Sequence, residues 1–529
     1  MSKELVGYKL MMAFEGAEAP ERILRWAAER PLGGFTLFRH YNVENAAQVR
    51  ELTAVLQKTA QDAGHPPLLI AGDQEGGQLI ALGDDTTQFP GNMALGATFD
   101  PALARQVGAA IGREMAAMGY NINYAPVCDL NSNPANPSLG IRAFGDDPQT
   151  VSEMAVAMIQ GLQEAGVAAT AKHFPGKGEA AVDSHYQMPL IDKSREELAA
   201  VELRPFQAAI DAGVKLIMSG HFAIPDITGS DVPATLSRAV MRDLIRKEIG
   251  FEGVIITDAL DMGAITQGAG QIIDVIAAVR AGVDLLLMKA DPELEERLYA
   301  GLQLAYSRGL IGEEHVIPSI RCTHRLRKWA GEQPQPDLEV VGCAAHQQLA
   351  RQVAERSLTL LRDEARLLPL RLNSAARIAA IMPQPKELTP ADISAYVRPL
   401  LAEALRFHHP RVDEFVVSHP PTEAEIARLK EKAGQYDLLV IGTISASLDE
   451  RQADLVNALL DTAVPAITVA LRTPYDLTVY PRSGTHVCTY GILRPSMAAL
   501  AAALWGDIPF AGRLPVDIPG LYPRGYRAG

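Results

Sequence analysis

Cysteine is scarce in this chain of 529 residues, which has only four, at Cys128, Cys322, Cys343 and Cys488. None of them forms a Cys-x-x-Cys pair, so the sequence indicates neither a zinc knuckle nor a disulfide framework. Reduced thiols in a reducing compartment are the simplest interpretation of this pattern.

Long apolar runs are also absent. No stretch approaches the roughly 18 apolar residues that a membrane-spanning helix needs. The N-terminal segment, MSKELVGYKLMMAFEG, has neither the uninterrupted apolar core nor the small-residue cleavage site of a secretory signal. We therefore expect a cytoplasmic protein without a membrane span.

Basic residues are outnumbered, with 49 Lys and Arg against 63 Asp and Glu, which gives a formal net charge of −14. Such a surface repels phosphate backbones and anionic headgroups, so nucleic acids and membrane surfaces are unfavourable partners. A neutral small-molecule substrate fits better. Nothing in the sequence determines the oligomeric state.

The length of the chain suggests two domains and is also compatible with three, because domains typically have roughly 100–250 residues. Up to about residue 325, short apolar runs alternate with amphipathic helical patterns. Eight such repeats match the count and size of a closed (β/α)8 barrel. The predicted strands are residues 7–14, 34–38, 68–72, 121–125, 168–171, 215–219, 254–257 and 283–288, and examples of predicted helices are 100–118, 150–165, 195–212 and 238–249.

A doubly wound sheet can alternate in the same way. However, no glycine-rich phosphate-binding fingerprint follows an early strand, and this favours the barrel.

The pattern breaks near residue 329 into a polar, proline-bearing stretch that is typical of an interdomain linker. Beyond it we predict four more strands, at 377–382, 438–442, 466–471 and 485–490, separated by helices. The sequence thus predicts an α/β protein with a (β/α)8 TIM-type barrel at 1–328, a linker at 329–342 and a smaller α/β layered sandwich domain at 343–529.

The most informative segment is KHFPGKGEAAVDSHYQMP, which begins at Lys172 at the carboxyl end of the fifth predicted strand. Barrel enzymes keep their active sites at that end. Asp183 and His185 are two residues apart, so in an extended segment their side chains project to the same side. A carboxylate beside an imidazole orients the ring, and the pair can donate a proton to a leaving group and later accept one from water. His173, Asp183 and His185 as metal ligands are a less favoured alternative.

The second segment, GVIITDALDMGAI, places Asp258 where the seventh predicted strand ends. A carboxylate at the catalytic rim of a barrel can attack an anomeric carbon or stabilise an oxocarbenium ion. A plain helix cap is the alternative role for this residue.

Two further segments suggest sugar-binding residues. In LLIAGDQEGGQLIAL, Asp73 and Glu75 compete for a functional role, and we favour Asp73 because it is nearer the strand end. The following glycine pair, 76–77, permits a tight turn that would let a sugar approach the backbone. In NPSLGIRAFGDDP, the guanidinium of Arg142 can hold vicinal hydroxyls, although a lone arginine is more often a surface residue.

Taken together, these segments resemble glycoside hydrolase family three, specifically its β-N-acetylhexosaminidase branch. The segments that carry the resemblance occur in the family's order, and they are DQEGGQ (73–78), PVCDL (126–130), NPSLGIRAF (136–144), KHFPGKG…DSH (172–185) and ITDAL (256–260). The resemblance covers the whole predicted barrel. It extends more loosely into the second domain.

The resemblance implies retaining hydrolysis of terminal, non-reducing β-N-acetylglucosaminides, from oligosaccharides or from cell-wall fragments as in peptidoglycan recycling. Asp258 would be the nucleophile, and His185, paired with Asp183, would serve as acid and base. The residues implied to hold the sugar are Asp73, Arg142, Lys172 and His173. No cofactor or metal is implied.

Three departures from the family pattern leave the substrate open. Lys177 replaces a histidine, Gln78 replaces an arginine, and Ala81 stands where a second sugar-contacting arginine is common. The alternatives are a β-glucosidase-like or phosphorolytic enzyme, or a catalytically weak sugar-binding barrel. Acidic residues of the second domain, such as Glu423, Glu425, Asp449 and Glu450, are either substrate contacts or solvated helix faces.

Overall fold

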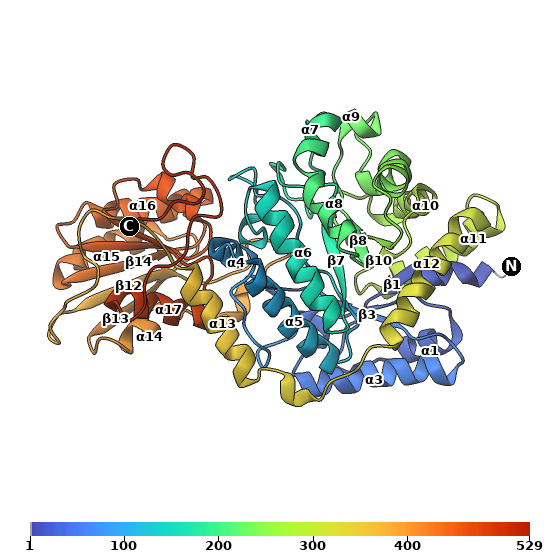
Figure 1. Cartoon of the computed structure of the whole chain (residues 1–529), viewed down its shortest axis with the longest axis horizontal. Coiled ribbons are helices and arrows are strands. Elements are labelled where there is room, and N and C mark those ends of the chain that lie inside the picture. The colour runs from blue at the N-terminus through green and yellow to red at the C-terminus, as the bar shows by residue number, and fades with distance from the viewer. Residues whose placement is uncertain (1–2, 529) are drawn as a thin grey trace.

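Eight short parallel strands organise the first part of the chain in the computed structural model, which describes residues 3–528 (Figure 1). Neighbours in chain order pair with one another, β10 pairs with β1, and a bridge between Ile256 and Leu285 joins the last two strands. This arrangement closes the barrel and excludes the doubly wound alternative. The strands are β1 (Leu10–Met12), β2 (Gly34–Thr36), β3 (Leu69–Gly72), β6 (Ile122–Asn123), β7 (Ala168–Phe174), β8 (Leu216–Ser219), β9 (Val254–Thr257) and β10 (Leu286–Leu287).

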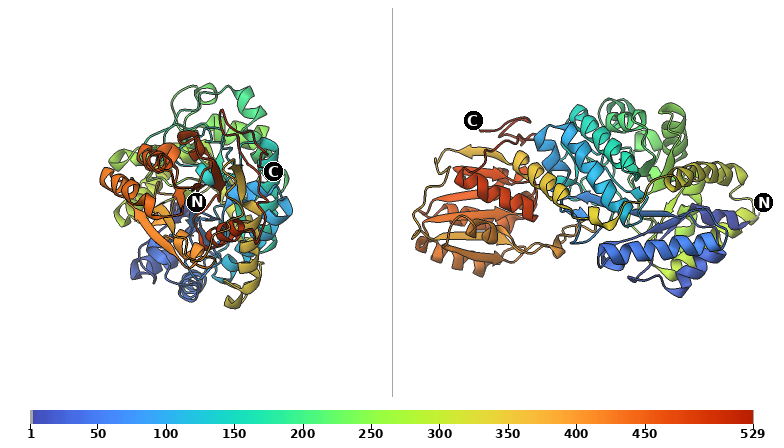
Figure 2. Two further views of the ribbon diagram at one scale, coloured as in Figure 1. Left: turned by 90° about the vertical axis from the view of Figure 1, so that its left-hand side faces the viewer. Right: turned by 60° about the horizontal axis from the view of Figure 1, so that its bottom comes forward.

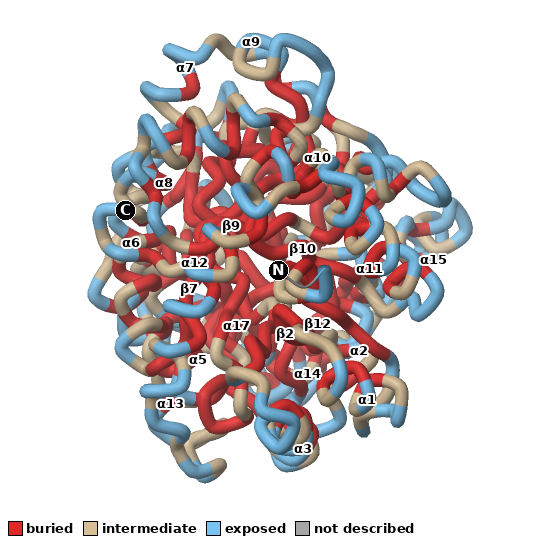
Figure 3. Tube along the Cα trace, turned by 90° about the vertical axis from the view of Figure 1, so that its right-hand side faces the viewer, coloured by how far each residue is buried: buried red, intermediate tan, exposed pale blue. Residues whose placement is uncertain are grey.

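The barrel interior is filled by side chains. Figure 3 shows the strands as a buried centre surrounded by partly exposed helices. Branched and long apolar residues dominate this interior, as is usual for such barrels. One apolar cluster includes Met11, Leu69, Ile122, Ala168, Leu216, Val254, Ile256 and Leu285, all fully or almost fully buried.

Helices form the outer layer of the barrel. The longer ones are α1 (Glu21–Glu29), α3 (Ala46–Asp62), α5 (Pro101–Ala117), α6 (Pro148–Glu164), α8 (Leu203–Asp211), a π-helical segment (Ala239–Glu248), α10 (Gln271–Ala281), α11 (Pro292–Ser307) and α12 (Glu313–Gly331). Shorter ones are α2 (Arg39–Asn42), α4 (Asn92–Thr98), α7 (Arg195–Ala200) and α9 (Pro225–Thr228). Asp100 and Asp147 cap α5 and α6 with their side chains, and a proline follows each cap.

Apart from shifts in strand ends elsewhere, three differences between the predicted barrel elements and the structure have a local cause or change the type of element. The first predicted strand is shorter, because Lys3–Lys9 forms a 3₁₀ helix. The helix predicted at 195–212 is divided into α7 and α8, because Pro205 has no N–H for a helical hydrogen bond and its ring blocks the preceding turn. The segment predicted as an α-helix at 238–249 is a π-helix instead.

The second domain is a six-stranded sheet with the order β11-β16-β15-β14-β12-β13, in which only β11 is antiparallel. Its helices lie on both faces of the sheet (Figure 2). The strands are β11 (Thr359–Asp363), β12 (Ile378–Pro383), β13 (Val412–Val417), β14 (Leu438–Thr443), β15 (Ala466–Ala470) and β16 (Thr485–Cys488), and the helices are α13 (Ala344–Ser357), α14 (Leu401–Arg406), α15 (Glu423–Lys432), α16 (Glu450–Leu460) and α17 (Arg494–Trp505).

The predicted combination of a barrel and a smaller α/β domain is confirmed, but two strands of the second domain were missed. Both β11 and β13 lie at an edge of the sheet. In β13, Asp413 and Glu414 interrupt the apolar pattern, as charged residues commonly do on edge strands. The boundaries at 328 and 343 stay predictions, and in the structure α12 ends at Gly331 and α13 begins at Ala344.

The two domains contact one another directly. Helix α13 packs against α4 of the barrel and α17 of its own domain. Arg356 pairs with Asp100 at 2.8 Å across the junction. Near the carboxyl end of the barrel, Nε2 of Gln78 donates to the carbonyl of Ala391 at 3.3 Å, and the Ile393 N–H donates to the carbonyl of Gln78 at 2.9 Å. The second domain therefore reaches the catalytic end of the barrel.

Candidate active site

A cavity of about 110 Å³ opens at the carboxyl end of the barrel strands. All four predicted sugar-binding residues line it, together with His185 and Asp258. Lys172 and His173 lie at the end of β7 itself, and the other four residues follow β3, β6, β7 and β9, so residues far apart in the sequence meet here. The other lining residues are Leu37, Phe38, Arg39, His40, Leu79, Ala81, Lys177, Met218, Ala259, Leu287, Lys289, Pro390, Ala391 and Ile393.

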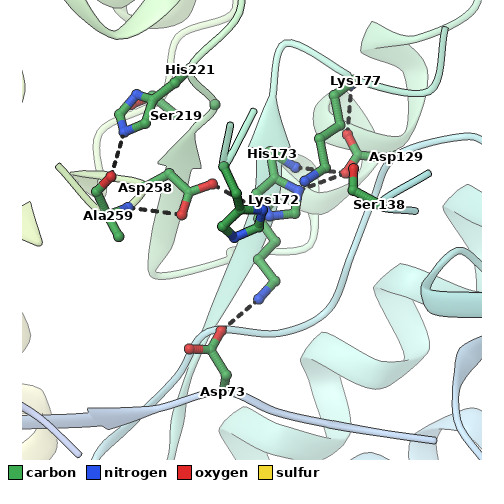
Figure 4. Close-up of polar contacts among 12 residues, drawn as sticks. Asp73, Asp129, Ser138, Lys172, His173, Lys177, Ser219, His221, Asp258 and Ala259 are labelled. Carbon is green, nitrogen blue, oxygen red and sulfur yellow. Dashed lines mark hydrogen bonds and ion pairs between the residues drawn. The ribbon is translucent and has the colours of Figure 1, made fainter. Parts of the chain in front are cut away.

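Asp258 follows β9 directly and points into this group (Figure 4). Its Oδ1 accepts the N–H of Ala259 at 2.8 Å, and its Oδ2 lies 3.8 Å from Nε2 of His173. Burial alone would raise the pKa of the Asp258 carboxyl, but the nearby His221 and Lys177 bring this pKa below its usual value. The carboxylate is therefore ionised at neutral pH, as a nucleophile must be.

Asp183 and His185 meet as predicted, but through a turn and not an extended segment. Oδ1 of Asp183 accepts both the His185 N–H at 3.0 Å and Nδ1 of the same ring at 2.6 Å. The N–H groups of Tyr186 and Gln187 bond back to the Asp183 carbonyl, which closes the turn. Burial alone would raise the pKa of Asp183, but its hydrogen bonds to His185 lower it overall. An ionised Asp183 thus holds Nδ1 as a donor and leaves Nε2 for proton transfer.

A buried network of opposite charges forms the floor of the cavity. Lys172 lies 2.7 Å from both Asp73 and Glu75. Arg142 binds Glu75 through two parallel hydrogen bonds of 2.8 and 2.9 Å. Burial would raise the pKa of Glu75, but Arg142 and Lys172 lower it to about 2. The structure places Asp73 in the cavity wall, whereas Glu75 is almost fully buried and orients the two cations.

A second carboxylate, Asp129, orients His173. Nδ1 of His173 lies 2.7 Å from Oδ2 of Asp129, and the N–H of Lys177 donates to the other carboxylate oxygen at 2.9 Å. Burial, reinforced by the positive charge of Lys177, holds the pKa of His173 well below its usual value. A neutral His173 that donates through Nδ1 presents Nε2 as an acceptor for a substrate hydroxyl.

The glycine pair that follows Glu75 has a packing role. Both residues have positive φ, 83° for Gly76 and 62° for Gly77, which explains why glycine is needed. A Cβ on Gly77 would lie 2.8 Å from the carbonyl oxygen of Pro90. The predicted turn is present, but the group that approaches it closely is the backbone of residues 90–91 and not a sugar.

The three departures from the family pattern all lie at or beside the cavity. Gln78 binds the second domain, as described above. Ala81 lines the cavity with only its methyl group. Lys177 is buried and lines the cavity, and its ammonium group makes no hydrogen bond or ion pair within residues 3–528.

Several cavity residues were missed from the sequence, although some carried a signal. Arg39 and Lys289 come directly after predicted strands, where barrel enzymes place functional side chains. His221, which lies behind the cavity wall, donates from Nε2 to the Ala259 carbonyl at 3.1 Å. Its Nδ1 lies 2.9 Å from the Thr235 hydroxyl, and the ring thereby supports the backbone beside Asp258. The loop residues Pro390, Ala391 and Ile393 belong to the second domain, and no local pattern indicated them.

The metal alternative finds no support in the described part of the chain. Within residues 3–528, no three His, Cys, Asp or Glu side chains are grouped as a metal site would require, although His173, Asp183 and His185 all lie in that range. The four cysteines, also in that range, are free. No helix in the same range is long and apolar enough to cross a bilayer.

An ionised carboxylate and a carboxylate-supported histidine thus lie together in a polar cavity at the catalytic end of a (β/α)8 barrel, an arrangement suited to glycoside hydrolysis. The chain belongs to glycosyl hydrolase family 3, since residues 7–326 match the model of the family's N-terminal domain.

The relatives span both domains of the chain. It is 30% identical to beta-hexosaminidase A of Pseudoalteromonas piscicida, over 94% of this chain and 91% of that protein. It is 28% identical to the beta-N-acetylglucosaminidase/beta-glucosidase of Cellulomonas fimi, over 89% and 86%. The structure of a family 3 beta-N-acetylglucosaminidase from Paenibacillus sp. str. FPU-7 superimposes with a TM-score of 0.92, at 34% identity, over 98% of this chain and 99% of that one.

Proposed function

We propose that the protein is a retaining β-N-acetylhexosaminidase that removes terminal, non-reducing β-N-acetylglucosamine from oligosaccharides or cell-wall fragments in the cytoplasm. The observation that carries the proposal is the Asp183–His185 pair beside Asp258 in one cavity. A histidine supported by aspartate can act as both acid and base. The names of the relatives support the choice of sugar.

In the first step of the proposed reaction, the Asp258 carboxylate attacks the anomeric carbon. The bond from that carbon to the leaving-group oxygen breaks, and Nε2 of His185 gives its proton to that oxygen. In the second step His185 takes a proton from water, the water oxygen bonds to the anomeric carbon, and the bond to Asp258 breaks. Two displacements retain the configuration at this carbon.

The proposed sugar-binding roles follow from the hydrogen-bond donors and acceptors that line the cavity. Asp73 and Nε2 of His173 accept from hydroxyls, whereas Lys172 and Arg142 donate to them. Lys172 stays protonated, because although burial lowers its pKa, Asp73 and Glu75 raise the pKa overall. Charged donors and acceptors form the stronger hydrogen bonds, which suits recognition of several hydroxyls.

A panel of nitrophenyl glycosides tests the proposal. The β-N-acetylglucosaminide should be turned over with a kcat/KM about 10²-fold or more above those of the β-glucoside and the β-xyloside. A site that hydrogen-bonds the acetamido group of its substrate discriminates strongly against sugars that lack this group. Release of nitrophenol is followed for each substrate. A preference for the β-glucoside would overturn the proposed sugar, and turnover of none of the three would overturn the enzyme class.

A second candidate activity is transfer of the sugar to phosphate, and one specific observation favours it. The unpaired ammonium of Lys177 lies in the wall of the cavity that holds Asp258 and can neutralise an incoming oxyanion. A histidine acid/base would also not repel phosphate as a carboxylate would. The same panel with added inorganic phosphate separates the two activities, since phosphorolysis would yield a sugar 1-phosphate in place of the free sugar.

We further propose that Arg39 supplies the charged donor that Ala81 lacks. Nη1 of Arg39 reaches the carbonyl of Ile80, next to Ala81, at 3.4 Å, while Nη2 pairs with Asp84 and the guanidinium stacks on the ring of Tyr396. Arg39 is nearly buried and lines the cavity, so a substrate oxygen is within its reach.

Replacing Arg39 should therefore weaken substrate binding. Arg39→Ala is expected to raise KM about tenfold with little change in kcat, because a charged hydrogen bond contributes about 1.5–3 kcal/mol. Adding Ala81→Arg should lower KM again, since it returns a guanidinium to the same wall. Arg25→Ala, an exposed change on α1, is the control. A loss confined to kcat, unaffected by Ala81→Arg, would indicate a structural role for Arg39 instead.

A further inference from the structure

A second and larger cavity lies at the junction of the two domains. Its volume is about 540 Å³, against about 110 Å³ for the catalytic cavity. Small-molecule sites typically have about 300–1,000 Å³, so this cavity is large enough for a ligand of several rings. Its walls come from the barrel residues Gln78, Pro134 and 136–141 and from second-domain segments that follow β12, β13, β14 and β15.

The topology of the second domain explains why a cavity forms there. Five parallel strands have the order β13-β12-β14-β15-β16, so the chain leaves β12 toward one side of the sheet and later returns to the other side with β14. The loops after β12 and β14 diverge and leave a crevice at the carboxyl ends of these strands. Ligands of doubly wound sheets bind at such a switch point. Leu388 and Thr389 line the cavity from the first loop, and Ile444 and Ser445 from the second.

The cavity wall holds a buried donor without a partner. The side chain of Arg472 is only 4% exposed, and its Nη2 pairs with Asp392 at 2.7 Å. Its Nε, however, is buried and has no hydrogen-bond partner among residues 3–528. Buried N–H groups are nearly always paired in native proteins, so an acceptor from outside residues 3–528, a water molecule or a ligand atom, is expected beside Arg472.

The charges around the cavity favour a neutral ligand. Three cations, Lys386, Arg451 and Arg472, face two carboxylates, Asp449 and Glu450. Two of the cations already have other partners, Glu423 for Arg451 and Asp392 for Arg472. The one remaining cation, Lys386, faces the two carboxylates, so the wall is slightly negative and an anionic ligand gains nothing there.

The other wall groups match the chemistry of a sugar. Hydroxyl and amide side chains, which can donate to and accept from sugar hydroxyls, alternate with apolar surfaces suited to the C–H faces of a sugar ring. The polar group comprises Gln78, Asn136, Ser138, Thr389, Ser445 and Thr473, and the apolar group comprises Pro134, Pro137, Leu139, Leu388, Pro420 and Leu448.

The two cavities share their dividing wall. Ile141 faces the junction cavity and the next residue, Arg142, faces the catalytic one. In the same way Thr389 and Ala391 face opposite sides, and Gln78 bonds to Ala391 between them. The catalytic cavity is the smaller of the two, so additional units of a long substrate must lie elsewhere.

We propose that the junction cavity is a second carbohydrate-binding site that takes neutral sugar units. These units belong either to the leaving-group side of the bound substrate or to a separate oligosaccharide. The choice of N-acetylglucosamine oligomers as probes rests on the proposed function, whereas the location and the neutral polyhydroxyl chemistry of the site do not.

Calorimetric titration of the inactive Asp258→Asn protein with N-acetylglucosamine tetramer tests the site. Leu448, half-exposed at the rim of the cavity, is changed to Trp to block it, and Glu450→Ala removes a carboxylate from the wall. Each change should weaken tetramer binding by about tenfold. The matched controls are Leu448→Met and Glu431→Ala, and the latter alters an exposed residue of α15 outside the cavity wall. Both controls should bind as the parent does.

Kinetics in the Asp258-containing protein distinguish the two sources of sugar. The blocking variants should turn over the nitrophenyl monosaccharide within about twofold of the parent rate. A raised KM for the tetramer would assign the site to the leaving-group side of the substrate. An unchanged KM together with a lost second binding event would assign it to a separate chain.

Two results would overturn the second site: a tetramer that binds no differently from the monosaccharide, or tetramer binding that neither blocking variant alters. Cellotetraose is titrated in parallel. If the nitrophenyl panel failed, tetramer or cellotetraose binding that is sensitive to Leu448→Trp would still support the junction site, so the two proposals fail separately.

Discussion

Asp258→Asn is expected to lower kcat/KM on the nitrophenyl β-N-acetylglucosaminide by about 10⁴-fold or more, as is typical when a residue that forms the covalent intermediate is removed. The amide has nearly the same shape as the carboxylate but cannot attack the anomeric carbon. Lys177, His173 and His221 surround the Asp258 carboxylate and keep it in a fixed position in the cavity wall.

The fold should survive this change. The amide oxygen of the substituted side chain would still accept the Ala259 N–H, and burying a neutral amide costs less than burying a carboxylate. We therefore expect a thermal midpoint equal to or above that of the parent protein. Asp243→Asn, on the exposed side of the π-helical segment, is the matched control and should retain full activity. A residual activity above about one tenth would exclude Asp258 as the nucleophile.

His185→Ala should slow substrates with poor leaving groups by about 10²–10⁴-fold, the usual contribution of general acid catalysis. Nitrophenyl substrates should lose much less in the first step, because their leaving group needs no proton. Rates on N-acetylglucosamine dimer and on the nitrophenyl glycoside are compared. Asp183→Asn should have the same selective effect with a smaller magnitude, since the ring remains but loses the carboxylate that holds Nδ1 at 2.6 Å.

The control for this comparison is His324→Ala, which alters an exposed histidine on α12 that does not line the cavity. It should leave both rates unchanged. Equal losses on the two substrates in His185→Ala would argue that His185 positions the loop and does not transfer the proton.

The barrel could be predicted because each strand is a local apolar run and each helix has its own periodic pattern. The strand ends then identified Asp73, Lys172, His173 and Asp258 as rim residues, and the cavity holds all four. Prediction failed where the local pattern was weak. The charged edge strand β13 lacks an apolar face in its middle, and Pro205 divides a helix that otherwise has a continuous pattern.

The Asp183–His185 pair shows a different limit. The two-residue spacing correctly predicted that the two side chains meet. It wrongly predicted an extended backbone, because side chains two residues apart share a face only in an extended chain. In the structure, N–H groups of a turn donate to the carbonyl and the carboxylate of Asp183, and this turn brings the two side chains together.

The type of fold and the rim residues could be predicted from the sequence alone, since these depend on residues that lie next to one another in the chain. The folded structure was needed to establish which charges neutralise which, as in the contact of Lys172 with both Asp73 and Glu75. Within residues 3–528, it also decided that Lys177 is left without a partner and that Ala391 and Ile393 close the catalytic cavity from another domain. These features depend on contacts between segments tens to hundreds of residues apart, and such contacts leave no periodic trace in a single sequence.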